Sequence, residues 1–348
     1  MKGGYLDFSV NLNPVPLSTE LLKRINKEMN SLLSCYPNEE DALNFLADYY
    51  SIPVGNIVIG NGSTEIFFIL PDALCFKGAI VVMPTFWEYT ISLERSNSKV
   101  IPFYVEEKDN FNLDIIALER FVGQKVKEED IGAVYLCNPN NPTSTLVRGK
   151  EVIRLCNKFP KIKFVVDETY LLFDKDYRQL SLISTAISRQ NLVVVFSFSK
   201  FFNIPGARIG VCVASNEDIK SIKSQRVPYG LNGVGLKMIP MILRDKKYAE
   251  FSRDLISSQR QRLYKRLSEI PYLKVFEPRA NYILVKIVNA KKGDATDLCN
   301  FLDKEGIIAR HGANLGLGGR YVRFTVRTIE ENDFLIKVIK KSFEQFRS

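Results

Sequence analysis

The stretch NLVVVFSFSKFFNIPGARIG, residues 191–210, places polar and cationic residues between two apolar runs. Its first run, 192–197, is short and rich in β-branched residues, which predicts a buried strand, and residues 207–214 predict a second strand. Lys200 follows the first run directly, and Arg208 stands eight residues later. Ligands in an α/β sheet bind outside the carboxyl ends of the strands. The stretch therefore predicts a sheet with a cationic site at its edge.

Similar short runs occur at 56–60, 79–83, 99–105, 133–137 and 163–167, and segments of helical period separate most of them. This alternation predicts an α/β fold with a mostly parallel sheet covered by helices. After about residue 245 the pattern changes to a long charged helix, short strands and two further helices. We expect an N-terminal arm and helix at 1–30, a large domain at 31–245 and a smaller α+β domain at 246–348. Thr328 and Glu331 predict a capping box at the start of the last helix.

Composition narrows the classes of function. Hydrophobic residues make up 46% of the 348 residues, and charged residues 25%, as in an ordinary globular protein. No apolar run is long enough to span a bilayer, and the first residues lack an apolar signal core, so we expect a cytoplasmic protein without a membrane partner. The net charge of +9 is spread along the whole chain, which does not favour nucleic-acid binding.

Metal sites and disulfides are also not favoured. The six cysteines lie far apart without a CxxC pair, which predicts buried free thiols. The chain has one histidine, His311. A single histidine cannot form a multi-histidine metal site, and it is the one candidate base for a Ser-His-Asp triad.

The first strand-end motif is GNGSTE, residues 60–65. Gly60 and Gly62 predict a tight turn, and Ser63 and Thr64 open a helix whose free N–H groups favour an anion, phosphate above all. The alternative is a plain strand-to-helix turn with a serine cap. The motif is neither a P-loop nor a complete GxGxxG, because Glu65 stands at the place of the third glycine.

Two further motifs follow strands. NPNNPTS, residues 138–144, offers amide side chains, and Asp167 stands at the mouth of a buried strand. A carboxylate there either caps a loop or helix or pairs with a cationic ligand group. Taken alone, Lys200 is most simply interpreted as a solvated surface lysine. A lysine near apolar groups and other cations, by contrast, has a lowered pKa and becomes nucleophilic.

Together these groups fit one cofactor. The chain offers a phosphate-binding helix start, two hydroxyls with an arginine, an aspartate for a ring nitrogen and an amine for a Schiff base. Pyridoxal phosphate requires all of these.

The motifs NPNNPT, DETY (167–170) and SFSKFF, with the spacing from Lys200 to Arg208, resemble the class I/II aminotransferase family of fold type I pyridoxal-phosphate enzymes. The resemblance covers essentially the full length. It implies a large domain with a mostly parallel sheet, a smaller C-terminal domain and a homodimer with shared active sites. The chain is most similar to threonine-phosphate decarboxylases of cobalamin biosynthesis and to histidinol-phosphate aminotransferases.

The resemblance assigns roles to individual residues. Catalytic roles fall to Lys200, which would carry the cofactor, to Asp167 beside its ring nitrogen, and to Tyr170. Asn141 and Tyr170 would bind the ring hydroxyl of the cofactor, and Phe86 would stack on its ring. Tyr36 would reach the cofactor phosphate from the neighbouring subunit. The other phosphate contacts would be Gly62, Ser63, Thr64, Ser197, Ser199 and Arg208.

The substrate contacts implied by the resemblance lie mainly near the C-terminus. Arg323 would hold a carboxylate, Arg310 a phosphate, and Asn13 would lie in the arm over the substrate. The segments DFSVNLNP, PTFWEY and FTVRT with Arg327 favour decarboxylation of threonine phosphate, whereas Tyr170 is more typical of an aminotransferase acting on histidinol phosphate or on a broader range of amino acids. The rival functions are a dinucleotide-dependent oxidoreductase and a nucleic-acid binder.

Overall fold

The computed structural model describes residues 4–288 and 293–347. Its larger sheet has seven strands in the order β2-β8-β7-β6-β5-β3-β4. All of them are parallel to one another except β8, which is antiparallel to both of its neighbours. This confirms the predicted mostly parallel sheet. The strands are β2 (Ile57–Asn61), β3 (Gly78–Met83), β4 (Lys99–Tyr104), β5 (Ala133–Cys137), β6 (Lys163–Asp167), β7 (Leu192–Ser197) and β8 (Ile209–Val213).

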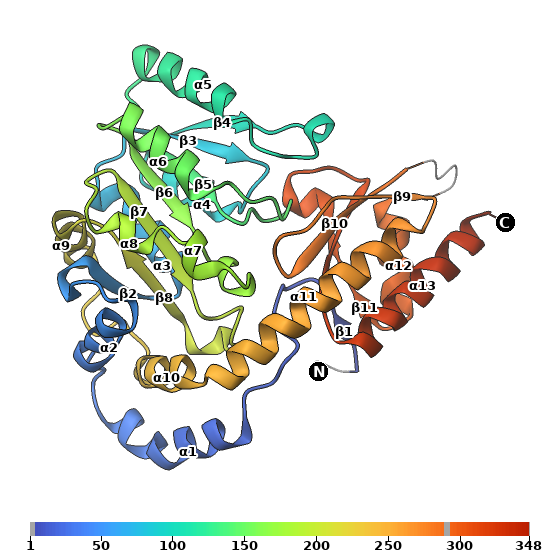
Figure 1. The fold of residues 1–348 in the computed structure, drawn as a ribbon, viewed down its shortest axis with the longest axis horizontal. Helices are drawn as coiled ribbons and strands as arrows, with labels where there is room; N and C mark the ends of the chain where they lie inside the picture. Colours follow the sequence, from blue (N-terminus) through green and yellow to red (C-terminus); the bar gives the residue numbers. More distant parts are fainter. Residues whose placement is uncertain (1–3, 289–292, 348) are drawn as a thin grey trace.

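Helices cover both faces of this sheet, as Figure 1 shows. Side chains alternate along each strand. Val193 and Val195 therefore pack with one group of helices, and Leu192 and Val194 with the other. The first group comprises α3 (Ser63–Ala73), α4 (Glu88–Arg95) and α9 (Asn216–Ser224). The second comprises α2 (Glu40–Tyr50), α5 (Ile115–Glu128), α6 (Gly149–Lys158), α7 (Tyr177–Leu180), α8 (Ile183–Ala186) and α10 (Gly233–Arg244).

Short 3₁₀ turns complete the connections of the larger part. They are η1 (Val54–Asn56), η2 (Glu107–Asp109), η3 (Leu171–Phe173) and η4 (Pro205–Ala207). The six cysteines are free, as predicted, but Cys35 and Cys75 are exposed, so the expectation of burial was wrong for these two.

The C-terminal part contains a second sheet, which is antiparallel and has the order β12-β13-β10-β9. The long helix α11 runs from the larger part to this smaller one (Figure 1). Thr328 and Glu331 form the predicted reciprocal cap. The elements are α11 (Lys246–Ser268), β9 (Leu273–Val275), β10 (Tyr282–Ile287), α12 (Ala295–Lys304), β11 (Ile307–Ile308), β12 (Arg310–His311), η5 (Gly312–Leu315), β13 (Tyr321–Thr325) and α13 (Ile329–Arg347).

The N-terminal arm joins the two parts. Its strand β1 (Leu6–Asp7) pairs in parallel with β11, far away in the sequence. The following helix α1 (Thr19–Ser34) is capped by Ser18 and packs against α10 of the larger part. The arm therefore crosses from one part to the other, and the exact domain boundaries stay a prediction.

A charged contact also links the two parts. Glu107 of η2 accepts hydrogen bonds from Lys286 at 2.5 Å, Tyr321 at 2.6 Å and Lys274 at 3.2 Å. Burial opposes ionisation of Glu107, but these three donors outweigh it and lower its pKa to about 2. The contact fixes the larger part beside β13, which carries Arg323.

Candidate functional site

A cavity of about 400 Å³ lies at the carboxyl ends of β5, β6 and β7, where the larger sheet meets the C-terminal part and the N-terminal arm. The last residues of these strands, Cys137, Asp167 and Ser197, all line it. The structure brings most of the predicted site residues to this cavity: Ser63, Thr64, Phe86, Asn141, Asp167, Tyr170, Ser197, Ser199, Lys200, Arg208, Arg310 and Arg323.

One end of the cavity is suited to an anion. Helix α3 begins at Gly62, whose φ of +84° favours glycine, and no side chain caps the helix N-terminus. Arg208 lies over this turn, so that a Cβ on Gly62 would collide with its guanidinium. Gly62 itself does not line the cavity, whereas Ser63 and Thr64 do. Free helix N–H groups, two hydroxyls and a guanidinium form a phosphate-binding end.

Ser197 and Ser199 lie at this same end, after β7. Their hydroxyl oxygens are 3.0 Å apart, and the Ser197 hydroxyl donates to the carbonyl of Ile209 at 2.8 Å. That bond ties the end of β7 to the neighbouring β8. Both serines are buried in the cavity wall.

Asp167 is held from two sides. Its Oδ2 accepts a hydrogen bond from the Tyr89 hydroxyl at 2.5 Å, and its Oδ1 accepts one from the backbone N–H of Thr169 at 2.9 Å. Burial raises the pKa of Asp167, while the bonds from Thr169 and Tyr89 partly oppose this. A buried carboxylate without a paired cation favours binding of a positively charged ligand group, such as a protonated ring nitrogen.

Lys200 extends into the cavity from the end of β7. Its Nζ donates to the carbonyl of Val10 at 3.2 Å. Burial, with the charges of Arg323 and Arg208, lowers the pKa of Lys200 to about 8. At pH 7 roughly a tenth of this amine is therefore neutral and nucleophilic, far more than of an ordinary lysine. Burial and neighbouring cations are the conditions under which the sequence analysis expects a lysine with a lowered pKa.

Two arginines line the opposite end. Arg323 is buried, and its Nη1 donates to Asn141 Oδ1 at 2.5 Å, while its Nη2 donates to the carbonyl of Ser9. Its Nε has no partner among the described residues. Arg310 is paired with Arg323 in the β12–β13 register, and its guanidinium forms no hydrogen bond or ion pair with the described residues. Both guanidiniums thus retain donors for an anionic substrate.

Three residues of the N-terminal arm line the cavity, Ser9, Val10 and Asn11, and the side chain of Asn11 contacts Tyr170. The Nδ2 of Asn11 donates to the Tyr170 hydroxyl at 3.3 Å, and burial raises the pKa of Tyr170 to about 12. Asn13, which the sequence predicts over the substrate, does not line the cavity. Its amide donates to the carbonyl of Phe201 at 2.7 Å, and its role towards the substrate stays a prediction.

Two predicted cofactor contacts lie in different settings. Phe86 lines the cavity and packs edge-on against Tyr89, with ring centroids 5.4 Å apart. Tyr36 does not line it, is 80% exposed and contacts the ring of Tyr229 at 4.7 Å. Its predicted role in a neighbouring subunit stays a prediction.

Several cavity residues escaped the sequence analysis. Trp87 and Glu88, at the start of α4, line the wall, and Glu88 Oε2 is buried without a partner among the described residues. Asn314 and Leu315 of η5 line it as well. The motif PTFWEY follows the predicted strand 79–83, and this position could have indicated that Trp87 and Glu88 line the site. No comparable strand-end signal precedes η5.

Residues 4–339 match the model of the family described as aminotransferase class I and II. The chain belongs to this family. It is 32% identical over 341 residues to a histidinol-phosphate aminotransferase 2 from Archaeoglobus fulgidus, an alignment that covers 97% of this chain and 92% of that one. The solved L-threonine-O-3-phosphate decarboxylase from Porphyromonas gingivalis is 25% identical and superposes with a TM-score of 0.85, covering 97% of this chain and 99% of that one.

A further relative of this aminotransferase-family chain is longer. It is the adenosylcobalamin biosynthesis bifunctional protein CobDQ from Leptospira interrogans, which is 28% identical over 341 residues. The alignment covers 97% of this chain but only 39% of that protein. The family and the fold type I architecture are thereby confirmed, with an enzyme as the class of protein.

Enzymes of the aminotransferase class I and II family depend on pyridoxal 5'-phosphate, and the residues present fit this cofactor. Arg208 over Gly62 forms a phosphate cradle that a Cβ would fill. The Thr169 hydroxyl is buried without a partner among the described residues, in the same cavity as Lys200 and Asp167. The cofactor of this enzyme is therefore pyridoxal 5'-phosphate.

No helix within 4–288 and 293–347 is long and apolar enough to cross a membrane. Within the same ranges, no group of three or more His, Cys, Asp or Glu side chains is arranged to hold a metal ion.

Proposed function

We propose that this enzyme acts on a phosphorylated amino acid, and that it decarboxylates L-threonine O-phosphate or a close analogue. The observation that carries the proposal is the adjacency of Arg310 and Arg323 in the β12–β13 register, with both side chains lining one cavity. Two guanidiniums suit a substrate with a carboxylate and a phosphate, because each guanidinium can pair with an oxyanion through two parallel hydrogen bonds. The names of the relatives agree with this substrate class.

Seven residues of the cavity have a defined task in this proposal. Arg323 binds the substrate carboxylate, and Arg310 binds the phosphate. The bound cofactor supplies an electron sink. Asp167 holds the proton of its ring nitrogen, and Ser63, Thr64 and Arg208 bind its phosphate. When the carboxylate leaves as carbon dioxide, the protonated form of Lys200 delivers the proton that replaces it on the substrate Cα and becomes the neutral amine.

Transamination of histidinol phosphate is the second candidate. Tyr170 favours it, because this residue resembles the aminotransferase pattern and its ring lines the cavity. The sequence segments PTFWEY and DFSVNLNP favour the decarboxylase. Arg327 does not decide between them. It donates to the carbonyl of Asp7 at 3.0 Å and to Glu331 at 2.8 Å, and it does not line the cavity.

Two assays distinguish the candidates. L-Threonine O-phosphate should yield carbon dioxide, whereas histidinol phosphate with 2-oxoglutarate should yield no glutamate. Lys200→Ala should abolish turnover, and Arg310→Ala should raise KM by roughly tenfold to a hundredfold, because one charge-assisted pair is lost. The exposed Lys27→Ala serves as the control and should turn over normally. Formation of glutamate without carbon dioxide would select transamination. If the enzyme forms neither product, the assignment of Arg310 is contradicted.

We further propose a homodimer in the cytoplasm, in which Tyr36 reaches the partner's cavity. The exposure of Tyr36 and Tyr229, at 80% and 71%, supports an interface over these rings, because large exposed aromatic groups favour contact with a partner. The cytoplasmic location stays a prediction from the sequence.

A further inference from the structure

A second cavity, of about 170 Å³, lies behind the strand end that carries Asp167. It shares no lining residue with the cofactor cavity. Asp167 and Glu168 follow one another at the end of β6, and neighbouring residues of an extended chain point to opposite faces. Asp167 therefore contacts Tyr89 on one face, whereas Glu168 contacts Ser181 on the other. The two cavities lie back to back across the sheet.

The inner end of this second cavity has polar groups with unused hydrogen-bonding capacity. Glu168 accepts from the Ser181 hydroxyl at 2.5 Å and from the backbone N–H of Leu182 at 2.7 Å, which leaves a lone pair on each carboxyl oxygen. Burial raises the pKa of Glu168 to about 7, so near neutral pH its carboxyl group is also a donor in part of the molecules. The Tyr50 hydroxyl is buried without a partner among the described residues. A buried hydroxyl without a partner destabilises the protein until a ligand group pairs with it.

The walls of the cavity are apolar and its rim is cationic. Leu171, Leu172, Ile183 and Phe196 line the walls. At the rim, the exposed Arg178 donates to Tyr177 at 3.0 Å and to Tyr49 at 3.4 Å. These bonds use two of the five guanidinium N–H groups, so donors remain for an anion.

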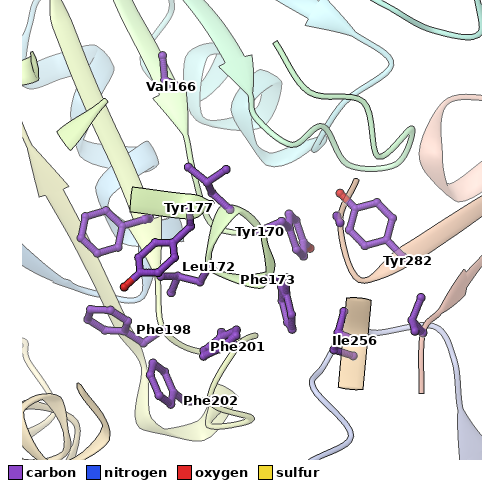
Figure 2. Close-up of a cluster of buried hydrophobic side chains, with 14 of the residues drawn as sticks. Val166, Tyr170, Leu172, Phe173, Tyr177, Phe198, Phe201, Phe202, Ile256 and Tyr282 are labelled. Atoms are coloured by element: carbon purple, nitrogen blue, oxygen red, sulfur yellow. The ribbon is translucent and has the colours of Figure 1, made fainter. Parts of the chain in front are cut away.

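Figure 2 shows the two sides of this region. Tyr177 and Leu172 point away from Tyr170 and Tyr282, which face each other on the side of the C-terminal part. The second cavity is thus separated from the substrate end of the first by the packed segment 168–177.

We propose that this cavity is a second binding site, which takes a small aromatic carboxylic acid with a hydrogen-bonding group on its ring. A cavity of about 150 Å³ accommodates benzene, so 170 Å³ admits one substituted ring. The ring lies between the apolar walls, its polar group pairs with Tyr50 and Glu168, and its carboxylate pairs with Arg178. The proposal is independent of the reaction at the first cavity.

The test is a titration of the cofactor-loaded enzyme with p-hydroxybenzoate, in which calorimetry measures the heat of binding. We expect saturable binding at one site per chain. Tyr50→Phe should weaken binding about fivefold, because one buried hydrogen bond is lost, and Arg178→Gln should weaken it about tenfold. Tyr264→Phe, a phenol on α11 outside the cavity, is the matched control and should leave the affinity unchanged.

The first cavity also contains arginines that could bind a carboxylate, so a further variant tests whether the probe binds there. Arg323→Lys should leave the affinity for p-hydroxybenzoate unchanged. Binding that is lost in Arg323→Lys but survives Tyr50→Phe and Arg178→Gln would place the probe in the first cavity and overturn the proposal. Absence of saturable binding to the wild type would overturn it too. Because Arg178 is exposed, its variant keeps the test decisive even if Tyr50→Phe fails to fold.

Discussion

Tyr89 is a residue whose hydroxyl favours the ionised form of the buried Asp167. It lies in α4, and its hydroxyl reaches the end of β6, 78 positions further along the chain. A hydrogen bond to a carboxylate favours the charged form. That charged form is the one required beside a protonated ring nitrogen, so Tyr89 supports cofactor binding without lining the cavity.

Replacing Tyr89 tests this role. In Tyr89→Phe the buried Asp167 loses one donor to its charged form, which raises the pKa of Asp167 further. Protonation of Asp167 then occurs at higher pH, so the enzyme should release pyridoxal phosphate at a higher pH than the wild type. The absorbance of bound cofactor during an acid titration measures this.

The control lies beside Tyr89. Tyr135 is a buried phenol whose ring is 5.7 Å from that of Tyr89, and its hydroxyl has no partner among the described residues. Tyr135→Phe should therefore leave the release pH unchanged. An equal shift in both variants would mean that core packing, and not the hydrogen bond to Asp167, sets the release.

At the scale of elements, the site depends on turns that follow strands. The loop after β5 carries Asn141 and turns at Ser144, where φ is +63°, a left-handed conformation that disfavours non-glycine residues. The Ser144 hydroxyl accepts hydrogen bonds from the backbone N–H groups of Ala280 at 2.7 Å and Arg279 at 3.0 Å. The turn thus connects the loop of the larger part to the start of β10.

Two substitutions separate these effects. Ser144→Gly relieves about 1 kcal/mol of left-handed strain but leaves the buried N–H of Ala280 unpaired, at about 1–3 kcal/mol, so we expect a net loss of about 1 kcal/mol in the free energy of unfolding. Ser144→Ala loses the same bond and keeps the strain, so it should be less stable than Ser144→Gly. Urea unfolding monitored by circular dichroism measures both, and a Ser144→Gly variant more stable than the wild type would contradict the role of the hydroxyl.

At the scale of the whole molecule, the proposed dimer completes each cavity. Lys200 lies within the cavity of its own chain, whereas Tyr36 lies on the exposed surface. If Tyr36 serves the partner, two different inactive variants should complement each other. A mixed dimer of Tyr36→Ala and Lys200→Ala would have one cavity with both residues intact.

Mixing and refolding the two variants tests this arrangement. Random pairing makes half of the dimers mixed, each with one intact site, so about a quarter of the wild-type activity should return. Each variant refolded alone provides the baseline. Activity that stays at the baseline, in a mixture shown to be dimeric by sedimentation, would contradict a shared site.

The sequence by itself determined the parallel sheet, the phosphate-binding turn at Gly62, and the placement of Asp167 and Lys200 at strand ends. These features are local: an apolar run fixes a strand, and the next residues must lie at its carboxyl end. The turn of the arm at Asn11 is not local in this sense, because it depends on contacts with distant residues, such as the hydroxyl of Thr325, to which the Asn11 N–H donates at 3.0 Å. The sequence therefore did not single out Asn11.

Only the tertiary structure decided which distant groups meet. It placed Tyr89 on Asp167, Arg310 beside Arg323, and Glu88 and η5 in the cavity wall. It also separated the second cavity from the first, with Glu168 and Tyr50 sharing the new one. These pairings arise from packing of whole elements and from burial, which sets the pKa of Lys200 and Asp167, and no short stretch of sequence encodes burial.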